Sequence, residues 1–130
     1  MYVNKLMPDY DEYDLKNKFV FGDDGHTVWI KDFFMGKQTG WAKGELKNNK
    51  ITIQAGQYVG DSDNNQLYLF PFTIDDNSNP VLLESVNLVK KNGAWTMEGS
   101  TDVYWGLWFY TSEKNISLTS AYGHKQSFRE

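Results

Sequence analysis

The chain has 130 residues, carries a net charge of −4 and contains no cysteine, while 16% of its residues are aromatic. A chain of this length forms a single domain that buries about 65% of its unfolded surface, so it needs neither a disulfide nor a metal to fold. Its 13 basic residues are outnumbered by 17 acidic ones and form no basic stripe, so nucleic acid is not an expected partner.

The sequence also bears on membrane association and export. No apolar run reaches the roughly 20 residues that a transmembrane helix requires, so we expect no membrane span. No hydrophobic segment follows residues 1–5, so these residues do not read as a signal peptide. The alternatives are a cytoplasmic protein or an exported domain whose signal lies outside this sequence.

We expect an N-terminal arm over residues 1–16, which lack hydrophobic periodicity, and a single β domain over residues 17–130. Three two-residue turns, at 24–25 (Asp-Gly), 48–49 (Asn-Asn) and 92–93 (Asn-Gly), suit type I′ hairpins with positive φ at both central residues. They join predicted strands at 18–22 and 26–33, at 41–47 and 50–55, and at 86–91 and 94–98. Further strands are predicted over 66–73, 81–85, 102–110 and 115–119, and Pro71 predicts an edge, a bulge or a bend.

The hairpin turns also predict which residues face each other. The turn at 92–93 places Leu88 opposite Met97 and Lys90 opposite Trp95, which gives one continuous apolar face. The turn at 24–25 pairs Phe19 with Ile30 and Phe21 with Val28, and the turn at 48–49 pairs Gly44 with Ile53. We therefore expect the following apolar residues in the core: Phe19, Phe21, Val28, Ile30, Ile51, Ile53, Trp95, Met97, Trp105, Leu107 and Phe109.

One wall of this core consists of small residues, Ala42, Gly44 and Ala55. Because protein interiors are close-packed, something must fill the space above them. Large aromatic side chains from facing strands are one filler, and a bound apolar ligand is the other.

Motifs for metal binding and catalysis are weak. Residues 61–65 begin like a calcium loop, but the sixth position is Gln66 and the twelfth is Phe72, so the EF-hand pattern fails. The two histidines, His26 and His124, have no nearby metal-ligand pattern. No nucleophile elbow, phosphate loop or His-Glu metal motif is present. We therefore expect no metal, no cofactor and no enzymatic activity.

Five aromatic residues fall outside the predicted apolar faces: Trp29, Trp41, Tyr104, Trp108 and Tyr110. They have two interpretations. They can pack under loops, cover a glycine or line a closed barrel, or they can form an exposed platform on which the C–H faces of sugar rings stack. Tyr104, Trp108 and Tyr110 share one face of a strand, where alternate residues are about 7 Å apart.

Four segments resemble a family of secreted or surface β-domains of unknown function from gut anaerobes, which often occur in tandem within longer lipoprotein-like chains. The segments are residues 27–31 (TVWIK), 40–44 (GWAKG), 50–53 (KITI) and 56–60 (GQYVG). The resemblance covers roughly residues 18–120. It implies a secreted or cell-surface location and carries no catalytic residues.

Together these patterns predict an all-β fold, an antiparallel up-and-down meander of about eight strands, closed as a lipocalin- or calycin-like barrel or packed as a two-sheet sandwich. The expected function is a non-catalytic extracytoplasmic binding module for a carbohydrate or small ligand. The alternative is a structural or protein–protein interaction domain that contacts a neighbouring domain or a second copy through the same aromatic residues.

Overall fold

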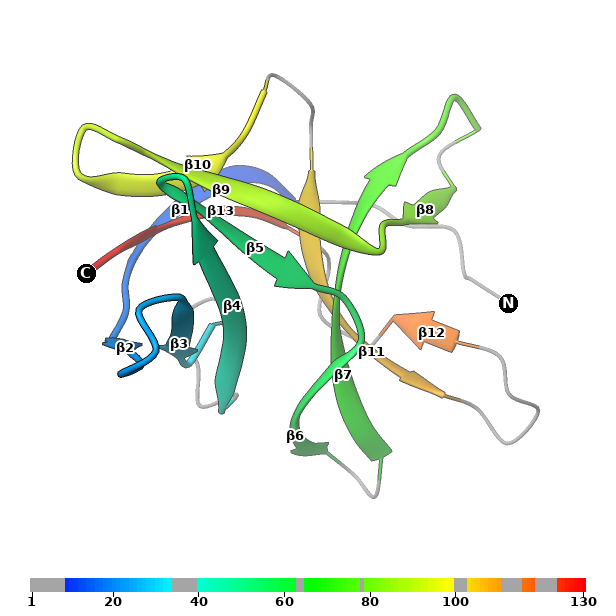
Figure 1. Cartoon of the computed structure of the whole chain (residues 1–130). Coiled ribbons are helices and arrows are strands. Elements are labelled where there is room, and N and C mark those ends of the chain that lie inside the picture. Colours follow the sequence, from blue (N-terminus) through cyan, green and yellow to red (C-terminus); the bar gives the residue numbers. More distant parts are fainter. Residues whose placement is uncertain are drawn as a thin grey trace.

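The computed structural model describes residues 9–33, 40–62, 65–77, 79–99, 103–110, 116–118 and 124–130. The regular secondary structure of these residues is entirely β, which confirms the expected all-β class (Figure 1). In the described segments, no helix has the length and apolar character needed to cross a membrane.

The described residues form thirteen strands. They are β1 (Asp9–Lys16), β2 (Phe19–Phe21), β3 (Thr27–Lys31), β4 (Trp41–Lys47), β5 (Lys50–Gln54), β6 (Gln57–Ser62), β7 (Asn65–Ile74), β8 (Pro80–Leu82), β9 (Ser85–Lys91), β10 (Ala94–Met97), β11 (Tyr104–Tyr110), β12 (Ile116–Leu118) and β13 (His124–Arg129).

Ten of the strands form one hydrogen-bonded path in the order β2-β3-β4-β5-β9-β10-β13-β11-β7-β6, while β12 pairs with β11 and β8 with β7 beside this path. Every pairing on this path is antiparallel, which confirms the expected antiparallel sheet, whereas β1 pairs with β13 in parallel. The sheet curls, with β2 to β5 in one arm and β6, β7 and β11 in the other, while β9, β10 and β13 cross the top between them (Figure 1). This half-barrel form is compatible with either a barrel or a sandwich.

Two hairpins have the predicted register and turn type. Leu88 pairs with Met97, and the turn residues Asn92 and Gly93 have φ values of 52° and 83°. Gly44 pairs with Ile53, and the turn between β4 and β5 likewise has two asparagines at positive φ. The type I′ turns therefore follow directly from the short Asn-rich loops between apolar strands.

The third hairpin has the predicted register but a different turn. Phe21 pairs with Val28, as expected, whereas Gly25 has a φ of 81° and Asp24 lies outside the positive-φ region. The Asp24 carboxylate accepts hydrogen bonds from the backbone N–H groups of His26 and Thr27, at 2.9 and 2.8 Å. This side-chain capping stabilises a longer loop, so the type I′ prediction is wrong here.

The main core lies inside the curled sheet. Of the predicted core residues, seven are buried, and Phe19, Met97 and Phe109 are partly buried against them. Phe21 is 45% exposed, so its prediction is wrong. It lies at the end of β2, a three-residue strand that ends the path, and no further strand lies beyond β2 on that path to cover it.

The space over the small-residue wall is filled by neighbouring side chains. A Cβ atom at Gly44 would lie 2.6 Å from Cγ2 of Ile51 and 2.8 Å from Cδ1 of Ile53. The two isoleucines of β5 thus occupy the volume that a side chain on β4 would need. At this position neither aromatic residues nor a ligand are required as filler.

Three strands were not predicted from the sequence, namely β1, β6 and β13. Residues 9–16, expected within an arm, form β1 through backbone pairing with β13, in which Leu15 lies opposite Phe128. Strand β13 is polar in sequence, yet Gln126 is buried and its Nε2 donates a 2.7 Å hydrogen bond to the carbonyl of Phe33. Strand β6 pairs with the first half of β7.

Pro71 occupies the point where β7 changes partner. On the side away from β11, β7 pairs with β6 up to Leu69 and with β8 from Phe72 onward. Because proline has no N–H to donate, it is tolerated where a ladder is interrupted. The predicted irregularity at this residue is therefore confirmed as a change of edge partner.

Candidate functional site

The five aromatic residues proposed from the sequence do not lie on one platform. Trp29 and Trp41 are 39% and 36% exposed, and Tyr110 is 51% exposed. Tyr104 and Trp108, in contrast, are 3% and 0% exposed. The structure therefore divides the set into a tryptophan pair, a buried pair and an exposed tyrosine.

The buried pair belongs to a second apolar cluster on the outer side of β7 and β11. The ring of Phe72 stacks on Tyr104 at 5.8 Å and meets Trp108 edge-on at 5.5 Å between centroids. Lys125 places its Nζ 5.5 Å from the centre of the Tyr104 ring. The expected row Tyr104–Trp108–Tyr110 is not an exposed platform, because Tyr104 and Trp108 are buried in the cluster with Phe72.

Trp29 and Trp41 lie on the outer face of neighbouring strands. In the β3–β4 register, Trp29 is opposite Lys43, and Trp41 is opposite Lys31. Val20 of β2 is opposite Trp29 on its other side. A shallow hollow of about 290 Å³ is lined by Val20 and the two tryptophans. We use the name tryptophan–lysine surface for Val20, Trp29 and Trp41 together with Lys31 and Lys43.

Each tryptophan of this surface has an ammonium group over its ring. Lys43 Nζ lies 5.7 Å from the ring centre of Trp29, and Lys31 Nζ lies 5.9 Å from that of Trp41. At an exposed site such a cation–π contact contributes about 0.5–1 kcal/mol. The contacts hold tryptophan and lysine in an alternating arrangement across the two strands.

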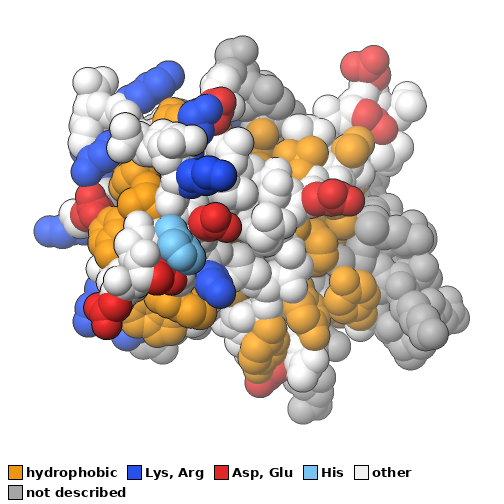
Figure 2. Space-filling model, in the orientation of Figure 1, with side chains coloured by type: hydrophobic (Ala, Val, Ile, Leu, Met, Phe, Trp, Pro, Cys, Tyr) orange, Lys and Arg blue, Asp and Glu red, His pale blue; other side chains and the backbone are white. Residues whose placement is uncertain are grey.

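A third lysine, Lys18, continues the surface. Its carbonyl accepts a 2.9 Å hydrogen bond from the N–H of Lys31, which places the two residues side by side. Ion pairs between described residues involve His26, Lys50 and Lys90, and none of the three lysines of this surface. Figure 2 shows hydrophobic side chains below the histidine, with both basic and acidic side chains near them.

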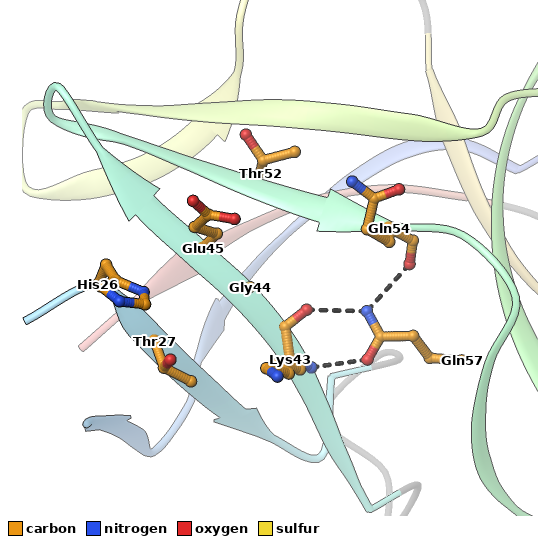
Figure 3. A pocket seen from close by; sticks show the side chains of 8 residues that line it. All are labelled: His26, Thr27, Lys43, Gly44, Glu45, Thr52, Gln54 and Gln57. Carbon is orange, nitrogen blue, oxygen red and sulfur yellow. Dashed lines mark hydrogen bonds between the residues drawn. The ribbon is translucent and has the colours of Figure 1, made fainter. Parts of the chain in front are cut away.

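A polar groove of about 420 Å³ adjoins the tryptophan–lysine surface on the same face (Figure 3). Lys43 belongs to both, so the groove begins where the aromatic surface ends. The groove carries hydroxyl, carboxamide and carboxylate groups, all suited to hydrogen bonding with a polar ligand. Its lining residues are His26, Thr27, Lys43, Gly44, Glu45, Thr52, Gln54 and Gln57.

Gln57 fixes the shape of this groove by linking the two arms of the sheet. Its Oε1 accepts from the N–H of Lys43 at 2.7 Å, and its Nε2 donates to the carbonyls of Lys43 and Gln54 at 2.8 and 2.9 Å (Figure 3). Strand β5 ends at Gln54, so the carboxamide replaces the ladder bonds that β5 no longer provides. The backbone of β4 is thereby held in place beneath Lys43.

A second exposed aromatic surface lies on the other arm, and only Tyr110 of it was predicted. Tyr58 and Tyr68 pair across β6 and β7, with ring centres 6.1 Å apart, and Tyr68 meets Tyr110 at 5.3 Å. The Tyr68 hydroxyl donates to Oε1 of Gln66 at 2.8 Å. A hydrogen bond to Asp61 raises the pKa of Tyr58. We call these three residues the tyrosine row; Figure 2 shows hydrophobic side chains gathered over this part of β6 and β7.

Sequence reasoning missed Tyr58 because β6 was not predicted as a strand. Tyr68 carried a signal, since it alternates with Leu67 and Leu69, which are buried in the main core. The groove residues carried little signal, because threonine and glutamine on an outer strand face are ordinary surface residues. In the described part of the chain, no group of three or more histidine, aspartate or glutamate side chains is arranged to hold a metal ion.

Comparison with known proteins gives no relative. No protein-family model matches the chain, no curated protein matches it, and no solved structure matches it. The resemblance to secreted β-domains of gut anaerobes therefore stays a prediction.

Proposed function

We propose that this protein is a non-catalytic carbohydrate-binding module whose ligand rests on Trp29 and Trp41. The observation that carries the proposal is the pair of half-exposed tryptophans on neighbouring strands, joined to a polar groove through Lys43. Exposed apolar patches bordered by polar groups are typical of binding sites. Sugars match such a surface because each ring has an apolar C–H face and a rim of hydroxyl groups.

In this proposal the two parts of the site divide the work of binding. The indole rings of Trp29 and Trp41 take the apolar faces of sugar residues. The groove then offers acceptors and donors to the hydroxyl groups, chiefly the carboxylate of Glu45 and the carboxamide of Gln54. Because the surface is shallow, we expect weak and broad binding, with avidity supplied by tandem copies.

We further propose that the module works outside the cytoplasm, in a secreted or cell-surface protein. The support is the resemblance carried by residues 40–44 and 56–60, which include Trp41, Lys43 and Gln57 of the site. These segments come together in space, since Gln57 binds the backbone of Lys43.

The test is a glycan panel read out by intrinsic tryptophan fluorescence. Trp95, Trp105 and Trp108 are buried, so a change on binding reports on Trp29 and Trp41. We expect at least one polysaccharide to shift the emission, and Trp29→Ala and Trp41→Ala each to weaken binding. Tyr110→Ala is the matched control, an exposed aromatic residue on the other arm. A panel without response would contradict the proposal.

A protein-interaction module is the second candidate, and the tyrosine row favours it. Tyrosine is enriched at protein interfaces, and Tyr58 and Tyr110 are each 51% exposed. In this version a neighbouring domain or a second copy covers the row. Sedimentation over a range of concentrations tests self-association, with Tyr58→Ser expected to abolish it if the row is the contact.

A further inference from the structure

We infer that the tryptophan–lysine surface takes an anionic glycan, one whose sugar rings carry carboxylate or sulfate groups. This inference rests on the proposed function and names its ligand class. It is carried by the juxtaposition of Trp29 and Trp41 with Lys18, Lys31 and Lys43 on one sheet face of an acidic protein.

The three lysines form a positive region that the sequence does not reveal. Lys18 precedes β2, Lys31 ends β3 and Lys43 lies within β4, so residues far apart in the chain are brought together by strand pairing. Each is exposed, and ion pairs between described residues leave all three out. Like charges gathered in this way repel one another, and a bound anion relieves this repulsion.

The position of the ammonium groups separates neutral from anionic ligands. Lys43 Nζ and Lys31 Nζ stand over the faces of Trp29 and Trp41, where a stacked sugar ring would lie. A neutral sugar must displace these cations and offers them only uncharged hydroxyl groups as hydrogen-bond acceptors. An anionic sugar also displaces them, but its carboxylate or sulfate then accepts charge-assisted hydrogen bonds from the same ammonium groups.

The adjoining groove determines which end of the ligand carries the charged sugar units. Its carboxylate, Glu45, lies two residues beyond Lys43 on the same face of β4 and repels an anion. Anionic sugar units therefore belong over the tryptophans, and neutral units belong in the groove. A uniformly charged chain such as single-stranded nucleic acid would fit the first part and be repelled by the second.

The experiment compares polymers that differ in charge alone. Polygalacturonate is titrated against its fully methyl-esterified form, and sulfated dextran against dextran, at about 20 mM and about 500 mM NaCl. We expect at least one of the two acidic polymers to bind about tenfold more tightly than its neutral partner at low salt. This preference should disappear at high salt, where surface charges are screened.

Two variants make the assignment specific. Lys31→Gln and Lys43→Gln should each abolish the preference for the acidic polymer over its neutral partner. Lys91→Gln is the matched control, an exposed lysine on β9, and should bind like the parent protein.

Each remaining outcome is decisive. Equal affinity for the charged and neutral partners would overturn this inference and leave the proposed function intact. Binding to neither acidic polymer would overturn this inference, whereas the proposed function falls only when the whole glycan panel gives no response. Tighter binding to a deoxythymidine oligonucleotide than to any acidic glycan, lost in the same lysine variants, would replace the glycan with a nucleic acid.

Discussion

Lys43 and Trp29 face each other across β3 and β4, with the ammonium nitrogen 5.7 Å from the centre of the indole ring. Lys31 and Trp41 repeat this relationship one step along the same pair of strands. The two pairs together give this sheet face two indole rings and two ammonium groups next to each other.

Collisional quenching should distinguish Trp29 and Trp41 from the other tryptophans. Iodide carries a negative charge and should be concentrated by Lys18, Lys31 and Lys43, whereas caesium should be repelled. We therefore expect iodide to quench a clear fraction of the fluorescence and caesium much less of it. The double variant Trp29→Phe with Trp41→Phe should lose most of the iodide-sensitive fraction, and equal quenching by both ions would contradict the charge assignment.

The carboxamide of Gln57 should contribute measurable stability. Gln57→Ala removes three hydrogen bonds to the backbone of Lys43 and Gln54, so we expect the free energy of unfolding to fall by about 1–3 kcal/mol. Urea denaturation measures this change. Gln54→Ala is the control of the same residue type, because Gln54 accepts its bond through the main chain, and an equal loss in both variants would argue against the bridging role.

The two apolar environments of tryptophan should respond differently to truncation. Trp105 is fully buried and packs against Phe33 and Phe128, so Trp105→Ala should destabilise by about 3–5 kcal/mol or prevent folding. Trp41→Ala, on the surface, should change stability by less than about 1 kcal/mol. Thermal melts of the two variants test the difference, and a Trp105→Ala protein as stable as the parent would show that the strand faces are inverted.

Gly93 should resist β-branched substitution because of its backbone conformation. Its φ is 83°, a region that valine strongly disfavours, and the nearest side-chain atom to an added Cβ is Nη1 of Arg129 at 3.5 Å. Steric crowding is therefore minor, and Gly93→Val should destabilise by more than about 1 kcal/mol through backbone strain. Gly93→Asn, which tolerates positive φ, should lose less; equal losses would point to crowding instead.

The capping carboxylate of Asp24 should make the β2–β3 hairpin sensitive to acid. The hydrogen bond from the Thr27 hydroxyl, followed by those from the backbone of His26 and Thr27, holds the pKa of Asp24 well below its usual range. Because the pKa is lower in the folded state, the ionised carboxylate stabilises the fold at pH values above the usual aspartate pKa of about 4. This stabilisation is lost as the pH falls through the pKa of the folded state. The stability difference between the parent and Asp24→Asn should thus be largest at neutral pH and shrink in acid. A difference independent of pH would contradict the capping role.

The sequence predicts well what depends on short-range pattern. The pairing of Leu88 with Met97 follows from alternation on both sides of an Asn-Gly turn, and the structure confirms it. Strand β13 escaped prediction because its buried residues include Gln126 and Ser127, whose polar side chains hide the strand from a hydrophobicity pattern. A partner strand far away in the chain, not local sequence, orders such a segment.

For the candidate site, the sequence predicted strand faces but not burial. Alternation placed Tyr104, Trp108 and Tyr110 on one strand face, but it could not tell that the first two are buried in a cluster with Phe72 while the third is exposed. The alternation of residues along a strand predicts the face on which a side chain lies. Whether that face is buried depends on tertiary packing. The cluster of Lys18, Lys31 and Lys43 likewise arises only when three strands pair.

The binding role of Trp29 and Trp41 can be tested by heteronuclear NMR of the five indole N–H groups during a titration with an acidic polysaccharide. We expect the signals of Trp29 and Trp41 to shift in a saturable manner, while those of the buried Trp95, Trp105 and Trp108 stay in place. Unchanged signals for Trp29 and Trp41, with shifts confined to backbone amides of Tyr58, Tyr68 and Tyr110, would contradict it and move the binding surface to the tyrosine row.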